Sequence, residues 1–264
     1  MTGRGKGLRL GGTPVLLYHA VGDAALPAGD RRYQVPLPRF EAHLDALAAS
    51  GRRAVSLADL WEGVGERVRA AAITVDDGRE SDYRLMFPRL LDRGFSADFF
   101  VNPGTVGQPG YLTWPELREM AESGMGVQSH GYDHASFWSL DRAALRRQIG
   151  DSRRALEDAT GRRVLFLAAP FGHVTDAAVE VALEEGYRAV CTSWSWPARP
   201  RRKTLGRVAV YETTTAADLA RVLEGRVLSY AARALRTAVV YPPKRLVVAL
   251  QPTRPGAAVA EHGA

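Results

Sequence analysis

Short apolar runs alternate along the chain with longer stretches in which apolar residues recur at helical spacing. The short runs predict strands, and the spaced stretches predict helices. We expect strands over residues 14–19, 53–57, 70–78, 95–101, 126–130, 164–170 and 187–193, and helices over 37–51, 81–94, 113–124, 139–161 and 175–186. Strands and helices that alternate in this way form parallel βαβ units, and their number favours a (β/α) barrel over an open sheet.

Composition changes this picture little. The chain has 264 residues, of which 46% are hydrophobic and 24% charged, as in an ordinary globular protein. Its single cysteine, Cys191, excludes an intrachain disulfide framework and a zinc site built from several thiolates. No apolar run approaches the ~18 residues of a membrane span. The N-terminal apolar run is too short for a signal-peptide core, so we expect a cytoplasmic protein.

Charge is distributed unevenly. Residues 199–264 hold 12 basic and 4 acidic residues, whereas the rest of the chain is nearly neutral. A basic tail would suit a peripheral contact with a membrane surface, although a solvated, arginine-rich face is the simpler interpretation. No nucleic-acid-binding motif accompanies the charge, so nucleic acid is not expected as a partner. We divide the chain into an N-terminal tail (1–13), one barrel domain (14–212) and a basic helical extension that packs on the barrel (213–264).

Polar residues stand where the predicted strands end. His19 ends the first strand, Asp76 and Asp77 end the strand over 70–78, and His130 ends a later strand, with His134 four residues beyond it. In a barrel the carboxyl ends of the strands meet at one rim, where active sites lie. We therefore expect these side chains to converge.

The combination points to a divalent metal. Two adjacent ionised aspartates repel each other unless a cation lies nearby. Asp77, His130 and His134 would supply three ligands and leave positions open for water and substrate. Asp76 would then be free to act as a base toward the metal-activated water. Taken singly, an Asp-Asp-Gly turn or a pair of histidines is more often structural, so the inference depends on their joint occurrence at strand ends.

These residues resemble the motifs of a known family, the polysaccharide deacetylases of the NodB-homology type (carbohydrate esterase family 4). Thr74-Val75-Asp76-Asp77-Gly78 is similar to the first motif, and His130-Gly131-Tyr132-Asp133-His134 to the second. Pro170-Phe171-Gly172 resembles the third motif, and the likeness runs from about residue 14 to 193. The resemblance implies a distorted, seven-stranded (β/α) barrel and metal-dependent removal of acetyl groups from sugars. It also implies that Asp76 is the base and Asp77 a metal ligand.

Two departures from the family matter. The usual late histidine that supplies the general acid is missing, and His19 precedes the aspartates instead, as in the circularly permuted branch of biofilm-polysaccharide deacetylases. We expect His19 to be the acid, with His173 as the second choice. Ala168 stands where many members carry an arginine that orients the catalytic aspartate, and Arg79 is our candidate for a replacement charge.

Four aromatic residues complete the predicted site. We expect Tyr18, Phe171, Trp194 and Trp196 to contact substrate together with Arg79, and a backbone N–H near Phe171 to stabilise the oxyanion. For the two tryptophans, packing into a hydrophobic core is an equal alternative.

The sequence thus predicts a deacetylase that hydrolyses an N-acetyl group on a sugar or glycoside. Metal-bound water is the expected nucleophile, with Asp76 as base and His19 as acid. The expected cofactor is one divalent ion, zinc first, with nickel, cobalt or iron as alternatives. Two other functions stay open, namely amide or imide hydrolysis on a non-sugar molecule and a catalytically impaired carbohydrate-binding protein.

Overall fold

The structure, a computed structural model, describes residues 10–22 and 28–235. Its main sheet is parallel, and hydrogen-bonded neighbours follow the order β10-β9-β8-β7-β6-β5-β1-β11. These strands are β1 (Val15–Tyr18), β5 (Ala70–Asp76), β6 (Asp98–Val101), β7 (Gly126–Ser129), β8 (Phe166–Ala168), β9 (Ala189–Thr192), β10 (Thr204–Gly206) and β11 (Val208–Ala209). β4 (Arg53–Ala54) pairs with β5, and β2 (Ala20–Val21) pairs with β3 (Gln34–Val35) in a separate small sheet.

One extended segment joins the two edges of the main sheet. β10 pairs with β9 and β11 pairs with β1, yet only Arg207 separates β10 from β11 in the chain. The sheet therefore curls into a nearly closed barrel, as the sequence predicted, and Arg207 lies at the point of closure. This segment was not among the predicted strands.

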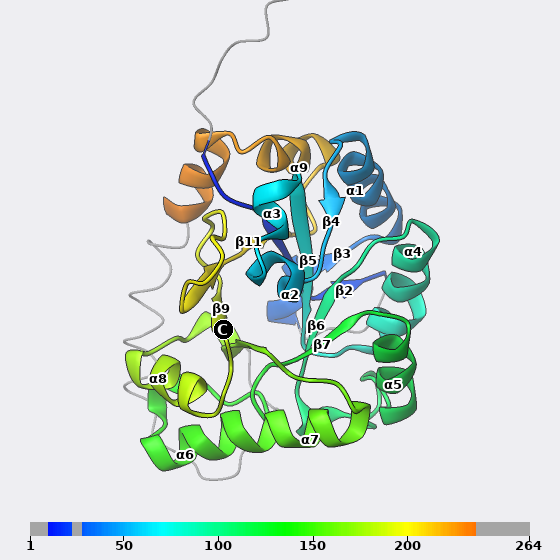
Figure 1. The fold of residues 1–264 in the computed structure, drawn as a ribbon. Helices are drawn as coiled ribbons and strands as arrows, with labels where there is room; N and C mark the ends of the chain where they lie inside the picture. The colour runs from blue at the N-terminus through cyan, green and yellow to red at the C-terminus, as the bar shows by residue number, and fades with distance from the viewer. Residues whose placement is uncertain (1–9, 23–27, 236–264) are drawn as a thin grey trace, which may run out of the picture.

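Helices cover the outside of the barrel (Figure 1). They are α1 (Leu37–Ala49), α2 (Leu57–Trp61), α3 (Val64–Arg67), α4 (Phe87–Asp92), α5 (Trp114–Glu122), α6 (Arg142–Arg146), α7 (Ser152–Thr160), α8 (Asp176–Glu184) and α9 (Ala216–Leu223). Thr113 begins α5 with a capping box, in which its hydroxyl accepts from the Glu116 N–H. The helix predicted over 81–94 restarts at Phe87–Pro88, after a π-helical turn over Asp82–Met86. The prediction over 139–161 is likewise divided by a π-helical turn over Arg147–Asp151.

The strand predicted over 53–57 was wrong beyond its first two residues. Ser56 accepts a hydrogen bond from the Asp59 N–H, and the Asp59 carboxylate accepts from the Ser56 N–H. This capping box starts α2 and ends the extended chain after β4. A short apolar run between polar residues is compatible with both a strand and the start of a helix, so the sequence pattern did not distinguish them.

Alternation along the strands separates two apolar cores. Side chains such as Val15, Ala72 and Phe100 fill the inside of the barrel, whereas Leu16 and Ile73 pack between the barrel and its helices. Because successive strand residues face opposite sides, Thr74 and Asp76 follow Ala72 on the inner face. The same alternation places the last inward side chain of each strand at the carboxyl rim.

The ends of the described chain pack against the barrel. In α9, Leu219, Val222 and Leu223 are buried, and the helix lies against α1. Leu10 donates its N–H to the Gly225 carbonyl. Much of the predicted extension over 213–264 and of the predicted tail over 1–13 falls on residues 236–264 and 1–9, outside the described residues, so these domain boundaries stay predictions. Within the described residues, no helix is both long and apolar enough to cross a membrane.

Candidate active site

Asp76 ends β5 on the inner face of the barrel and is buried. Its carboxylate accepts two hydrogen bonds from the guanidinium of Arg207, with Nη1–Oδ1 at 2.6 Å and Nη2–Oδ2 at 2.8 Å. Burial alone would raise the pKa of Asp76. Arg207 and His130 outweigh that cost and bring the pKa below its ordinary value. Asp76 is therefore held both ionised and fixed in orientation.

Arg207 is itself almost completely buried, with 1% of its surface exposed. Its Nε donates to the Thr192 carbonyl at 3.4 Å, and its guanidinium lies 5.1 Å from the ring centroid of Phe100. A buried guanidinium is stable only when it is paired, and here the bidentate carboxylate provides the pairing. Arg207, in the segment that closes the barrel, therefore supplies the positive charge that an arginine at position 168 supplies in many members of the family.

This arrangement corrects the expectation for Arg79. Its guanidinium does not bind Asp76; it stacks on the Tyr111 ring at 4.6 Å, and Nη2 lies 3.8 Å from Asp77 Oδ2. Ala168 faces the barrel interior and is fully buried, and its carbonyl oxygen hydrogen-bonds to His130 Nδ1. Sequence reasoning missed Arg207, although one signal was present, a single arginine inside the apolar run over 205–210.

Asp77, His130 and His134 come together as predicted. Asp77 Oδ1 lies 3.5 Å from His130 Nε2 and 3.3 Å from His134 Nε2, and the three ligand atoms lie within 4.8 Å of one another. Zinc bonds of about 2.0–2.1 Å in a tetrahedron place neighbouring ligand atoms about 3.3 Å apart. The donor set and its spacing therefore fit one divalent ion.

The hydrogen bond of His130 agrees with a role as ligand. Its Nδ1 lies 2.9 Å from the Ala168 carbonyl oxygen, which can only accept, so Nδ1 carries the proton. Once Nε2 gives up its proton, the neutral ring therefore has its lone pair on Nε2, the tautomer that a metal needs. In the metal-free protein, burial opposes protonation of His130, but Asp76 and Asp77 raise its pKa. Burial likewise opposes ionisation of Asp77, and hydrogen bonds from His130 and His134 hold its pKa well below the ordinary value.

Backbone geometry aims these ligands. Asp77 has φ of 85° and His134 has φ of 65°, in the left-handed region that residues other than glycine rarely adopt. Gly131, which follows His130, has φ of 76°, a conformation that glycine adopts without strain. Asn102, after β6, donates its side-chain amide to the carbonyls of His130 and Gly131 and was missed in the sequence.

His19 follows β1, and its ring centroid lies 4.5 Å from that of Tyr33, with the two rings tilted by 34°. Its Nδ1 is buried and has no hydrogen-bond partner among the described residues. Burial lowers the pKa of His19, while the charges of Asp77 and Asp76 act in the opposite direction. The charges of both carboxylates therefore affect the pKa of His19, although His19 forms no ion pair with either among the described residues.

The predicted contact of Tyr18 with substrate was wrong. Tyr18 precedes His19 in the chain and therefore faces the opposite side, toward α1. Its ring packs edge-on against Phe40 at 5.5 Å, and its hydroxyl donates to His43 Nδ1 at 3.2 Å. His43 in turn donates Nε2–H to the Thr214 carbonyl, so Tyr18 belongs to the layer between barrel and helix.

The other aromatic residues lie on the rim. Phe171 has φ of 58° and contacts the His134 ring edge-on at 4.5 Å. Trp194 and Trp196 follow β9 and are 46% and 45% exposed, so neither packs into a core. His173 stacks on Trp138 at 3.5 Å and hydrogen-bonds to the Ser136 hydroxyl, contacts that give it a structural role and favour His19 as the acid.

Comparison with known proteins agrees with this geometry. Residues 64–190 match the family model for polysaccharide deacetylase. The peptidoglycan-N-acetylglucosamine deacetylase of Bacillus cereus is 34% identical over 145 residues, which are 53% of this chain and 63% of that protein. YxkH of Bacillus subtilis is 24% identical over 184 residues, 68% of this chain and 64% of its own length. The chain thus spans less than two thirds of either curated relative.

Solved structures show the same fold. A polysaccharide deacetylase from Bacillus cereus is 26% identical, with a TM-score of 0.72 over 81% of this chain and 69% of that one. IcaB from Ammonifex degensii is 27% identical, with a TM-score of 0.70 over 83% of this chain and 98% of that one. The match over residues 64–190 confirms the resemblance to polysaccharide deacetylases that the motifs predicted, and the solved structures confirm the distorted barrel.

Proposed function

We propose that this protein removes an N-acetyl group from a sugar residue of a glycan or glycoside by metal-dependent hydrolysis. The observation that carries the proposal is the position of Asp76. This buried, ionised carboxylate has Oδ2 3.9 Å from His130 Nε2 and therefore stands directly beside the three-ligand set without belonging to it. A free carboxylate in that place can serve as the general base of a metal-dependent hydrolase.

The residues of this chain have distinct roles in the proposed reaction. When bound by Asp77, His130 and His134, a divalent ion supplies the charge that polarises the acetyl carbonyl and acidifies a water molecule. Asp76 accepts a proton from the attacking water, and Arg207 keeps its carboxylate pointed at that position. His19, from the neighbouring strand, donates a proton to the amine nitrogen as the carbon–nitrogen bond breaks. Zinc is the first candidate, since two nitrogen ligands and one oxygen ligand suit it.

The relatives support the substrate class. One of them is named for N-acetylglucosamine in peptidoglycan, and the matching family is named for polysaccharides. A cytoplasmic location and a peripheral membrane contact stay predictions.

The test is acetate release from N-acetylglucosamine oligomers by metal-loaded protein, with chelated and reloaded protein as controls. Asp76→Asn should retain stoichiometric metal and lose about 10²–10⁴-fold in turnover, because the base is gone while the ligands stay. Near-normal turnover of this variant would contradict the assignment of Asp76. An amide product other than acetate would favour hydrolysis of a non-sugar molecule, and sugar binding without turnover would favour a binding protein.

A further inference from the structure

The segment between β9 and β10 connects the two ends of the barrel. Because the two strands are parallel, the chain must return from the carboxyl rim to the opposite end before β10 begins. Near the rim, the backbone of Trp194 and Trp196 lies so close to Gly206 that a Cβ there would meet their carbonyl oxygens at 2.8 and 2.6 Å. At the far end, Ala198 pairs with Thr13, just before β1.

This segment borders a groove of about 640 Å³. Three of its lining residues connect it to the active site. Gly172 follows Phe171, which contacts the metal-ligand candidate His134; Gly206 precedes Arg207; and the Thr192 carbonyl accepts from Arg207. The groove therefore begins directly behind the Asp76–Arg207 pair.

The rim end of the groove is aromatic. Trp194 and Trp196 line it and are about half exposed, although most large apolar side chains in the described part of the chain are buried or partly buried. Binding grooves for organic ligands are commonly lined by aromatic side chains with a few placed polar groups. Flat indole rings beside a deacetylase site would suit the apolar faces of further sugar units.

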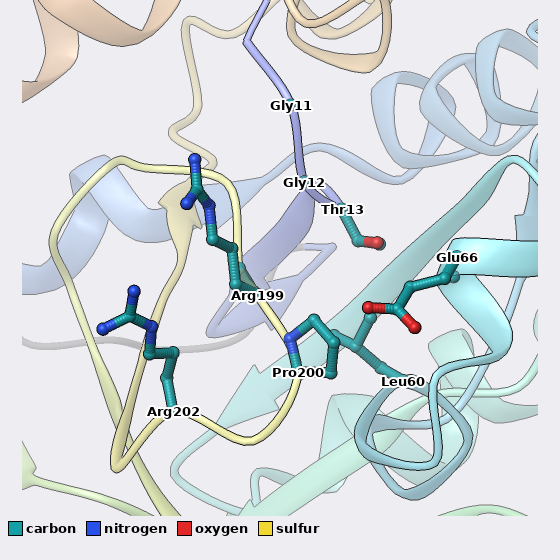
Figure 2. A pocket seen from close by; sticks show the side chains of 10 residues that line it. Gly11, Gly12, Thr13, Leu60, Glu66, Arg199, Pro200 and Arg202 are labelled. Atoms are coloured by element: carbon teal, nitrogen blue, oxygen red, sulfur yellow. The ribbon is translucent and has the colours of Figure 1, made fainter.

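The far end of the groove is cationic. Arg199 and Arg202 line it, and they also line an adjoining hollow of about 480 Å³. Figure 2 shows their side chains leaving the loop in the same direction, whereas the Glu66 carboxylate comes from α3 on the other side of that hollow. Within residues 10–22 and 28–235, neither arginine forms an ion pair. Both are exposed and could therefore bind an anion.

A strained turn keeps the two arginines together. Pro200 and Arg201 are the central residues of a turn flanked by Arg199 and Arg202, and Arg201 has φ of 58°. Such a position favours glycine, and an arginine there costs about 1–2 kcal/mol. Among the described residues other than glycine, only Asp77, His134 and Phe171 share a positive φ, and all three belong to the active site. Strain of this kind concentrates where a structure has a function to perform.

We propose that this groove binds the continuation of the acetylated glycan and that Arg199 and Arg202 select substrates with a phosphate or carboxylate group there. The inference rests on the proposed deacetylase function and adds the substrate class, an acidic rather than a neutral glycan. Phosphate and carboxylate share the geometry that a pair of guanidinium groups recognises.

The experiment compares three N-acetylated oligosaccharides of equal length, one neutral, one with a uronate and one with a phosphate monoester. The wild-type protein should favour at least one acidic substrate about tenfold in kcat/KM through a lower KM, and added salt should reduce the preference. A preference for both acidic substrates would mean that the site accepts a carboxylate as well as a phosphate. A preference for the phosphate alone would mean that it selects phosphate. R199A/R202A should lose the preference and keep its kcat on the neutral substrate.

The matched control is R162A/R163A, which removes two exposed arginines that lie before β8 and do not line the groove. It should keep the preference. Equal kcat/KM for all three substrates, or equal losses in both double variants, would overturn the inference and leave the deacetylase proposal intact. A second readout is quenching of tryptophan fluorescence by the acidic oligosaccharide on metal-free protein. Arginine-dependent quenching without any acetate release would support the groove and refute the proposed reaction.

Discussion

Two buried aspartates on neighbouring strands of this barrel have opposite surroundings. Asp76 ends β5 at the carboxyl rim, and Asp98 begins β6 at the other end of the barrel. Asp76 faces a guanidinium, which brings its pKa below the ordinary value. Asp98 accepts only from neutral donors, the Leu57 N–H at 2.7 Å and Gln128 Nε2 at 2.9 Å, and burial raises its pKa to about 6.

The hydrogen-bonding partner of each carboxylate, and not its burial, therefore decides whether the carboxylate is ionised. Both side chains are nearly inaccessible to solvent. A paired cation keeps Asp76 ionised for use as a base, whereas two neutral donors satisfy Asp98 without offsetting the cost of its charge. The carboxylate at the rim is thus ionised and able to accept a proton, whereas the carboxylate at the opposite end has a structural role.

Removal of Arg207 should have the largest effect. Arg207→Ala leaves the Asp76 carboxylate buried and unpaired, so we expect a loss of about 3–5 kcal/mol in the free energy of unfolding, measured by urea denaturation. Arg207→Lys should restore part of it, since it returns the charge without the bidentate geometry. Because Arg207 is a positioning residue, the acidic limb of the kcat/KM pH profile should move to higher pH in Arg207→Lys. An unchanged profile and a loss below ~1 kcal/mol would show that the pair does not hold Asp76.

Stability near Asp98 should depend on pH in the opposite sense to stability near Asp76. The folded-state pKa of about 6 lies above the ordinary value of 3.8 for an aspartate, so the native state binds the proton more tightly. The contribution of Asp98 is therefore most favourable below pH ~4, falls as pH rises to ~6 and then stays level, by about 3 kcal/mol in all.

The measurement is the difference in unfolding free energy between wild type and Asp98→Asn from pH 4 to 7. Because only the pH dependence is used, hydrogen bonds altered by the substitution cancel. For Asp76 the lowered pKa means stability that is present at neutral pH and lost in acid. A difference for Asp98 that stays flat across this range would show that its two donors suffice to keep it ionised.

Asn102→Ala should have a smaller effect, confined to the metal site. Loss of its amide frees the carbonyls of His130 and Gly131, so we expect about tenfold weaker metal binding, with activity recovered at high metal concentration. Metal titration measures this. Gln108→Ala is the control, since its exposed amide donates to Gly104 and not to the His130 segment. Equal metal affinity in both variants would contradict a positioning role for Asn102.

The sequence predicted the site residues that lie in contiguous motifs. It did not predict those whose position depends on how the barrel closes or on which side of a strand a residue faces. Asp77, His130 and His134 stand at strand ends, and a parallel barrel brings strand ends together. The role of Arg207 was missed because its position depends on the pairing of β10 with β9 and of β11 with β1, which close the barrel. Tyr18 was assigned wrongly because neighbours in a strand face opposite sides, so the residue beside His19 turns away from the site.

The most direct test of the account is an anomalous-scattering crystal structure of the zinc-loaded protein. We predict one ion within about 2.0–2.2 Å of Asp77 Oδ1, His130 Nε2 and His134 Nε2, with Asp76 unligated and still paired with Arg207. An ion bound elsewhere, or one that takes Asp76 as a ligand and releases Arg207, would contradict it.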